Sequence, residues 1–120
     1  MDTVFIEGLT IATRIGIYVG ERDAPQPVTL DLRLGFDNAA AGASGRIEDA
    51  LDYAAVVAAL RAFVAARDCG LLEQLAEACC DMLRARFHGI HSLDLRIDKP
   101  HAARALGCAH VGVAIHREFP

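Results

Sequence analysis

The sequence predicts an α+β fold in which two helices cover one face of a four-stranded antiparallel sheet, in the order β-β-α-α-β-β. Three segments, near residues 28–36, 92–98 and 111–115, alternate apolar side chains with polar or small ones. That period of two is typical of strands with one buried face. Between them, residues 53–66 and 72–88 follow a helical period instead. The 120 residues fit one domain, which we assign to residues 1–120.

The first strand is longer and less regular than the others. It runs from residue 4 to about residue 17, and Gly8 predicts a bulge or bend within it. In the last strand Val111, Val113 and Ile115 share one face, while the opposite face carries only small residues. Small side chains there indicate close packing.

The two helices are predicted from apolar stripes and from residues that start or end helices. Asp52 is placed to cap the first helix, and Gly70 interrupts the helical pattern. The second helix begins near Leu72 and ends by Gly89. Residues 38–45, rich in Ala, Gly and Ser, are expected to form a flexible connection. The stripes consist of Val56, Val57, Leu60, Phe63 and Val64 in the first helix and Leu72, Leu75, Ala76, Cys79, Met82 and Leu83 in the second.

Composition argues against several classes of function. The net charge is −4, whereas nucleic-acid-binding domains usually carry a basic excess. No basic run suits an anionic membrane, no apolar stretch approaches the ~20 residues that span a bilayer, and Asp2 stands where a secretory signal needs bases. We therefore expect a cytoplasmic protein that binds neither nucleic acid nor membrane. The hydrophobic fraction of 53% suggests apolar surface buried between subunits.

No motif for a metal, a cofactor or a serine nucleophile is present. The sequence contains no phosphate-binding glycine loop and no HExxH. His88 and His91 have a spacing that could hold a metal ion, but further ligands are missing. We expect no metal site and no cofactor, and we interpret the cysteines as reduced packing or loop residues. The cysteines are Cys69, Cys79, Cys80 and Cys108.

Four residues are candidates for chemistry, each with a structural alternative. Lys99 is the only lysine, and a buried lysine, unlike arginine, can lose its proton and act as a base; the alternative is an exposed residue at a strand end. Glu73 could accept two parallel hydrogen bonds from a ligand or simply favour the helix start. The structural alternative for Tyr53 is packing in the core, and the alternative for Glu21 is an exposed acid in a loop. The residues alone predict a fold but no reaction.

Several segments, taken together, match one enzyme family in order. They are Val4-Phe5-Ile6-Glu7-Gly8-Leu9 with Ile15-Gly16-Ile17-Tyr18, then Glu21-Arg22, Leu51-Asp52-Tyr53-Ala54, Leu72-Glu73-Gln74-Leu75-Ala76-Glu77, Ile97-Asp98-Lys99-Pro100 and Val111-Gly112-Val113. On these segments the chain resembles the dihydroneopterin aldolase family, which has the tunnelling fold (T-fold). Residues 101–110 depart from the family pattern.

The resemblance implies an activity and a role for each candidate. Retro-aldol cleavage of 7,8-dihydroneopterin would release glycolaldehyde and leave 6-hydroxymethyl-7,8-dihydropterin, a folate precursor, with side-chain epimerisation as a side activity. Glu73 would hold the pterin, with backbone groups near Leu72 and Tyr53. Lys99 would be the general acid and base, assisted by Tyr53 and Glu21. The expected partners are the pterin and further copies of the chain, as a barrel-forming tetramer or octamer with sites between subunits.

Three alternatives stay open at this level. The first is dihydroneopterin triphosphate epimerase, which needs cations for the triphosphate; Arg22 and Arg104 are the possible ones, but no basic cluster is evident. The second is 6-pyruvoyl-tetrahydropterin synthase, which needs a trio of zinc-binding histidines that is not found. The third is a non-catalytic pterin-binding subunit, which the presence of all four candidates argues against.

Overall fold

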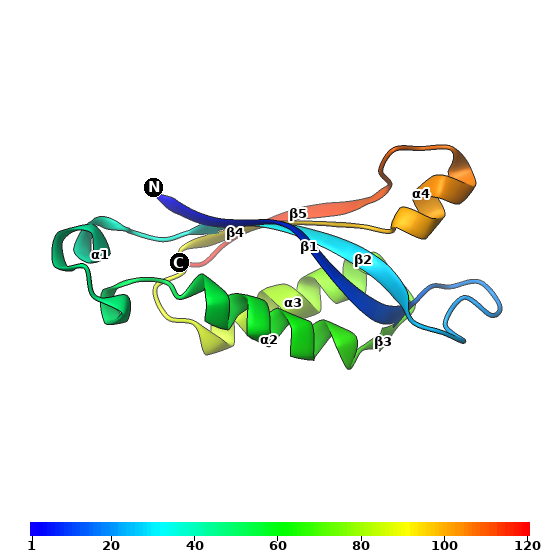
Figure 1. The fold of residues 1–120 in the computed structure, drawn as a ribbon, viewed down its shortest axis with the longest axis horizontal. Coiled ribbons are helices and arrows are strands. Elements are labelled where there is room, and N and C mark those ends of the chain that lie inside the picture. Colours follow the sequence, from blue (N-terminus) through cyan, green and yellow to red (C-terminus); the bar gives the residue numbers. More distant parts are fainter.

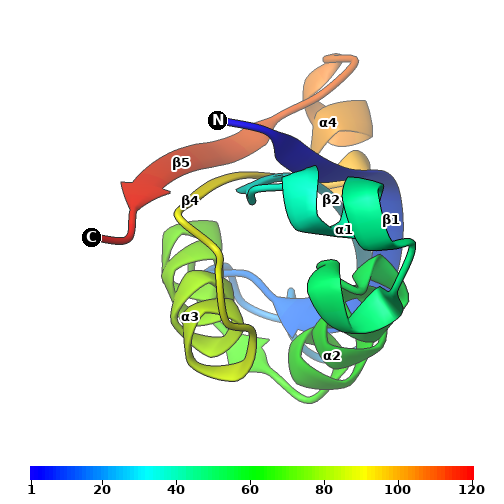
Figure 2. The same ribbon diagram turned by 90° about the vertical axis from the view of Figure 1, so that its left-hand side faces the viewer.

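The structure, a computed structural model that describes residues 1–120, is a curved sheet with two long helices on one face (Figure 1). A view at right angles shows α2 and α3 lying side by side beneath that face (Figure 2). The predicted α+β arrangement of the main elements is thereby confirmed. The strands are β1 (Thr3–Ile15), β2 (Gln26–Gly35), β3 (Asp68–Cys69), β4 (Ser92–Asp98) and β5 (Gly112–Glu118). The helices are α1 (Ala39–Ser44), α2 (Tyr53–Ala65), α3 (Leu72–Arg86) and α4 (Pro100–Leu106), with a short 3-10 helix, η1 (Ile47–Asp49).

The strand order across the sheet is β3-β1-β2-β4-β5. The four predicted strands pair antiparallel, β1 with β2, β2 with β4 and β4 with β5. A fifth strand, β3, was not predicted because its two residues are too few to show a period. It runs parallel to the end of β1, where Ile15 is paired with Cys69. β5 forms the other edge of the sheet and has one strand neighbour only.

The predicted irregularity at Gly8 is a bulge in β1. The register with β2 shifts between Ile6 and Leu9, and Gly8 has a φ of +70°, which a side chain would disfavour. The Gly8 N–H leaves the strand ladder and donates a hydrogen bond of 2.7 Å to the Asp31 carboxylate. The bulge therefore bends β1 without leaving its backbone donor unpaired.

The core lies between the sheet and the two long helices. Cross-strand pairs such as Leu30 with Ile97 and Leu32 with Leu95 point their side chains toward the helices and are almost fully buried. From α2 and α3, Val56, Leu60 and Leu75 meet them with no exposed surface. Burying each such side chain contributes about 1.5–3 kcal/mol. The predicted stripes therefore form the core, with Val57, Phe63 and Met82 packed at its margin.

Helix boundaries agree with the sequence for the long helices and differ in the connections. Asp52 caps α2, since its Oδ1 accepts hydrogen bonds from the Ala54 and Ala55 N–H groups at 3.0 and 3.2 Å. The expected flexible connection at residues 38–45 instead contains α1. α4 was not predicted either; it starts at Pro100, whose ring suits a first helical position, and ends at Gly107 with a φ of +76°.

The molecule is elongated, with extents of 52 × 26 × 24 Å. α1 lies at one end, and α4 and the β1–β2 connection lie at the other, beyond the region where α2 and α3 cover the sheet (Figure 1). None of the helices combines the length and apolar character needed to cross a bilayer.

Candidate functional site

A pocket of about 250 Å³ lies where the end of β4, the start of α3 and the connection after β1 meet. It contains Lys99, Glu21, Leu72 and Glu73, four of the five residues that the sequence predicts for the site. Apolar residues complete the lining, including Ile17, Tyr18, Leu71, Leu106, Val111 and Val113. The structure thus brings together residues from three distant parts of the chain.

Lys99 is positioned by the strand that precedes it. Leu93, Leu95 and Ile97 face the helices, and Lys99 follows at the next alternate position on the same side. Its backbone N–H donates a hydrogen bond of 3.0 Å to the Val111 carbonyl, which leads into β5. The Lys99 side chain retains 15% of its accessible surface, so the alternative of a freely exposed lysine is wrong.

Glu21 is the direct partner of Lys99. The Lys99 Nζ lies 2.5 Å from the Glu21 Oε2. The other carboxylate oxygen, Oε1, accepts hydrogen bonds from the Ile17 and Tyr18 N–H groups at 3.1 and 3.4 Å. The hydrogen bond from Lys99 is the main cause that lowers the pKa of Glu21 below its ordinary value of 4.5, while burial opposes that shift. An ammonium–carboxylate pair is therefore held at the wall of the pocket.

Gln26 supports this pair, although the sequence analysis did not single it out. Its amide is buried and donates a hydrogen bond of 2.8 Å from Nε2 to the Ile15 carbonyl. The Gln26 side chain also contributes, less than Lys99 does, to lowering the pKa of the Glu21 carboxyl group. The signal was present in the sequence, because Gln26 precedes Val28 and Leu30 at the buried positions of the alternating strand.

The start of α3 supplies a second polar wall. Leu72 is buried, whereas the Glu73 side chain is exposed at the pocket. The residue before the helix, Leu71, makes no side-chain cap, so the first N–H groups of α3 have no capping partner. A carboxylate beside free backbone donors can bind a planar ligand that offers N–H groups next to an acceptor.

Tyr53 does not belong to the pocket of the same chain. It is the first residue of α2, it is 65% exposed, and it is absent from the pocket lining. α2 begins toward the end of the molecule that holds α1, whereas Lys99 directly precedes α4 at the other end (Figure 1). The 13 residues of α2 alone span about 20 Å. The core-packing alternative for Tyr53 is wrong, since the side chain is exposed.

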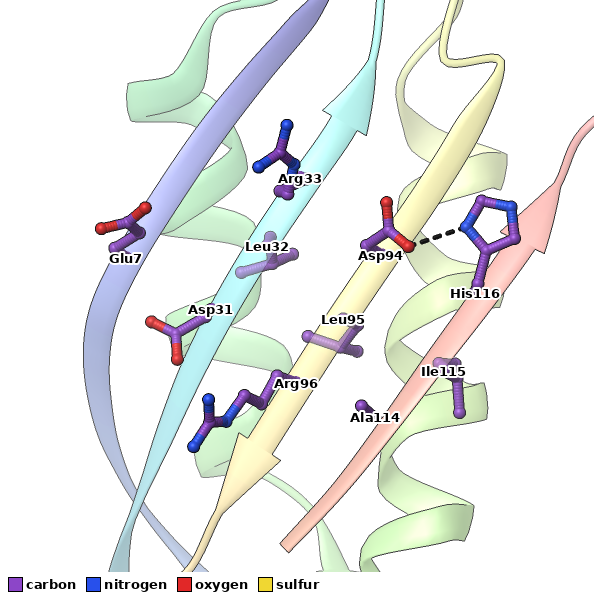
Figure 3. Close-up of a pocket in the computed structure, with 10 residues that line it drawn as sticks. All are labelled: Glu7, Asp31, Leu32, Arg33, Asp94, Leu95, Arg96, Ala114, Ile115 and His116. Carbon is purple, nitrogen blue, oxygen red and sulfur yellow. Dashed lines mark hydrogen bonds and ion pairs between the residues drawn. The ribbon is translucent and has the colours of Figure 1, made fainter. Parts of the chain in front are cut away.

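A larger hollow, of about 560 Å³, lies over the polar face of the sheet (Figure 3). Acidic and basic side chains alternate across it, and Asp94 is paired with His116 at 2.7 Å. It contains none of the predicted site residues. We consider the smaller pocket the better candidate because it combines apolar walls with converging polar groups.

The structure contains no group of three or more His, Cys, Asp or Glu side chains arranged to hold a metal ion. The four cysteines form no disulfide; Cys69, Cys79 and Cys80 are buried, and Cys108 is exposed.

Comparison with known proteins gives one consistent family. The family model described as dihydroneopterin aldolase matches residues 4–116. The chain is 36% identical to the dihydroneopterin aldolase of Escherichia coli K12 over 118 residues, which cover 98% of this chain and 93% of the relative. It is 32% identical to the Haemophilus influenzae dihydroneopterin aldolase, covering 98% and 97% of the two chains. The crystal structure of the E. coli enzyme in complex with neopterin superposes with a TM-score of 0.91 at 33% identity, covering 98% and 99%.

Proposed function

The chain belongs to the dihydroneopterin aldolase family, and on that premise we propose that its pocket cleaves the side chain of 7,8-dihydroneopterin. The products are glycolaldehyde and 6-hydroxymethyl-7,8-dihydropterin, which makes the protein a carbon–carbon lyase of folate biosynthesis. The observation that carries the proposal is the Lys99–Glu21 pair, which lies in one pocket with Glu73.

Glu73 and the start of α3 anchor the pterin in this proposal. The Glu73 carboxylate accepts hydrogen bonds from the 2-amino group and the adjacent ring N–H, and backbone groups at Leu72 complete the recognition. This anchor directs the side chain of the substrate toward Lys99. Fixing the reacting groups in this way removes much of the entropic cost of the reaction.

Lys99 moves the protons of the reaction, and Glu21 orients it. A proton leaves the side-chain hydroxyl, the carbon–carbon bond breaks, and the bonding electrons move into the C=N bond of the pterin ring. The carbon left on the ring then takes up a proton, so the overall charge balances. The ring is the electron acceptor, and proton transfer is the main chemistry left to the protein, where it contributes typically ~10²–10⁴-fold.

Tyr53 serves the site from a neighbouring subunit. Since Tyr53 and Lys99 lie toward opposite ends of one chain, both can act at one site only if two chains contribute. The apolar residues Ile17, Tyr18, Val19 and Leu71 are exposed around the pocket, and β5 has a free edge. We propose a ring of chains joined through their sheets, as a tetramer or a pair of stacked tetramers.

Mixed oligomers test the shared site. Lys99→Ala and Tyr53→Phe chains, each nearly inactive alone, are mixed, unfolded together and refolded. We expect the mixture to regain turnover, because some interfaces receive both native residues. Native mass spectrometry verifies the mixing and counts the chains. Mixed oligomers that show no gain over either parent contradict the shared site.

The proposed location is the cytoplasm, where the four unpaired thiols remain reduced. A cell-fractionation experiment in the source organism tests this location.

Product analysis tests the activity itself. Purified protein is incubated with 7,8-dihydroneopterin in the presence of a chelator, and the pterins and glycolaldehyde are quantified. Release of the two products in equal amounts supports cleavage. Inversion of a side-chain carbon without cleavage, or turnover restricted to the triphosphate, supports the epimerase instead. Within one chain Lys99 is the only cation lining the pocket, and Arg22 is paired with Asp68 at 3.6 Å. Binding without turnover of either substrate would indicate a non-catalytic subunit.

A further inference from the structure

Asp98 is a buried acid whose partner is the side chain of a loop histidine. It is the last residue of β4, it is 5% exposed, and its Oδ2 accepts a hydrogen bond of 2.9 Å from the His110 Nδ1. The other buried polar side chains, Thr13 and Gln26, donate to backbone carbonyls instead. Asp98 is thus the one buried carboxylate, and its hydrogen bond ties two separate segments of the chain together.

The two segments are those that hold Lys99. Asp98 directly precedes Lys99, and His110 directly precedes Val111, whose carbonyl accepts the hydrogen bond from the Lys99 N–H at 3.0 Å. Residues 98 and 99 are therefore joined to residues 110 and 111 by two hydrogen bonds. One joins the side chains of Asp98 and His110, and the other joins the backbones of Lys99 and Val111. These two hydrogen bonds connect the residues that precede α4 with the residues that follow it.

Asp98 and His110 lie outside the pocket that contains Lys99. Successive side chains of a strand point to opposite faces, so Asp98 points away from the face that carries Lys99. His110 accordingly lines a hollow on the polar side of the sheet with Arg96 and Ala114, and neither His110 nor Asp98 lines the pocket of Lys99. Direct contact of the pair with a substrate in that pocket is excluded by this arrangement.

We propose that Asp98 and His110 are positioning residues for Lys99, an inference that rests on the proposed function of the pocket. A lysine stem is long and flexible, so the protein fixes the ammonium group mainly by fixing the backbone and by the contact with Glu21. The Lys99 backbone itself makes two hydrogen bonds, one from its N–H to the Val111 carbonyl and one from the Ala103 N–H to its own carbonyl. Without the additional link between Asp98 and His110, the strand end that carries Lys99 is held less firmly, and the Nζ shifts relative to the substrate. A misplacement of about 1 Å can reduce turnover by as much as ~100-fold.

Variants of His110 separate positioning from simple stability. His110 is an exposed side chain, so its replacement leaves no cavity in the core, but it removes the partner of the buried Asp98 carboxylate. The free energy of unfolding of each variant is therefore measured beside its kinetics. His110→Ala removes the donor, whereas His110→Asn places an amide N–H at nearly the position of Nδ1. The control is His116→Ala, which removes a second histidine–aspartate pair. In that pair His116 of β5 lies 2.7 Å from Asp94 of β4, far from Lys99 along the strands.

The kinetic outcome concerns kcat and KM separately. We expect His110→Ala to lower kcat about tenfold with KM within about twofold, because the pterin anchor at Glu73 is untouched. His110→Asn should recover most of kcat, and His116→Ala should retain it. A wild-type kcat in His110→Ala, or no recovery in His110→Asn, overturns the proposal. The turnover of wild type and of Lys99→Ala is measured in the same assays, and the comparison of these two proteins tests the proposed function itself.

A second readout does not depend on the reaction. Lys99 is the only lysine, so labelling lysine with ¹³C at Cε gives a single side-chain signal. Its chemical shift should change in His110→Ala and return toward the wild-type value in His110→Asn, with His116→Ala unchanged. An unaltered signal in His110→Ala overturns the positioning role even where wild type releases no glycolaldehyde.

Discussion

The backbone of Gly16 lies directly against the carboxyl group of Glu21. A Cβ atom added to Gly16 would overlap the Glu21 Cδ and Oε1, and Gly16 has a φ of +144°, a conformation that favours glycine. The Gly16 N–H also donates to the Cys69 carbonyl at 3.1 Å, which ties the turn to β3. Gly16 therefore leaves the space in which Glu21 folds back to reach Lys99.

Replacing Gly16 with alanine should disrupt the site more than the fold. The new methyl group displaces the Glu21 carboxylate from Lys99, and we expect kcat to fall by about 10–100-fold. The matched control is Gly20→Ala in the same turn. Gly20 also has a positive φ, of +81°, but its added Cβ would meet only Asp23, at 3.5 Å. Equal losses in the two variants would assign the effect to backbone strain instead of to Glu21.

Lys99 and Glu73 should separate catalysis from binding. We expect Lys99→Ala to bind a pterin nearly as well as wild type while kcat falls by about 10²–10⁴-fold, since a proton-transfer group is lost. Glu73→Ala should instead weaken pterin binding sharply, measured by calorimetry or fluorescence. Gln74→Ala, an exposed neighbour outside the pocket, is the control. Unchanged turnover in Lys99→Ala, or normal affinity in Glu73→Ala, would remove the respective role.

The Lys99–Glu21 pair should make stability depend on acid pH. Because the hydrogen bond from Lys99 lowers the pKa of Glu21 below 4.5, the folded state binds that proton less readily than the unfolded state. The pair's contribution is full above the ordinary pKa and is lost as pH falls through the lower, folded-state value. Urea unfolding at fixed protein concentration should show the stabilities of wild type and Glu21→Gln converging as the pH falls below the ordinary value of 4.5. The exposed Glu48→Gln is the control, and a difference that is unchanged with pH contradicts the prediction.

The cysteines should differ in reactivity with thiol reagents. Burial raises the pKa of Cys79 to about 12 and also raises that of Cys80, whereas Cys108 is exposed. The reactive species is the thiolate, so one thiol per chain should react rapidly at pH 8 and all four after unfolding. Cys108→Ser should abolish the rapid phase. A second rapidly reacting thiol in that variant would contradict the burial of Cys69, Cys79 and Cys80.

Local patterns in the sequence were enough to predict the main elements. The alternation in β2, β4 and β5 and the stripes of α2 and α3 reflect which side chains leave water, and this periodicity is visible without any contact. Gly8 and Asp52 acted as predicted because a bulge and a helix cap depend on a few neighbouring residues. The lone Lys99 could be singled out for the same reason, from its residue type and its place after a strand.

Tertiary structure alone decided which of these residues meet. Glu21 and Lys99 are 78 residues apart, and they touch only because β2 lies between β1 and β4 and carries the β1–β2 connection to the end of β4. The same arrangement leaves Tyr53 out of the pocket and places His110 behind Lys99. The sequence pattern also failed to predict short elements such as α4, because its seven residues form only about two helical turns and show no clear period. Periodicity reports burial along a segment, whereas a site depends on distances between segments, which are set by packing.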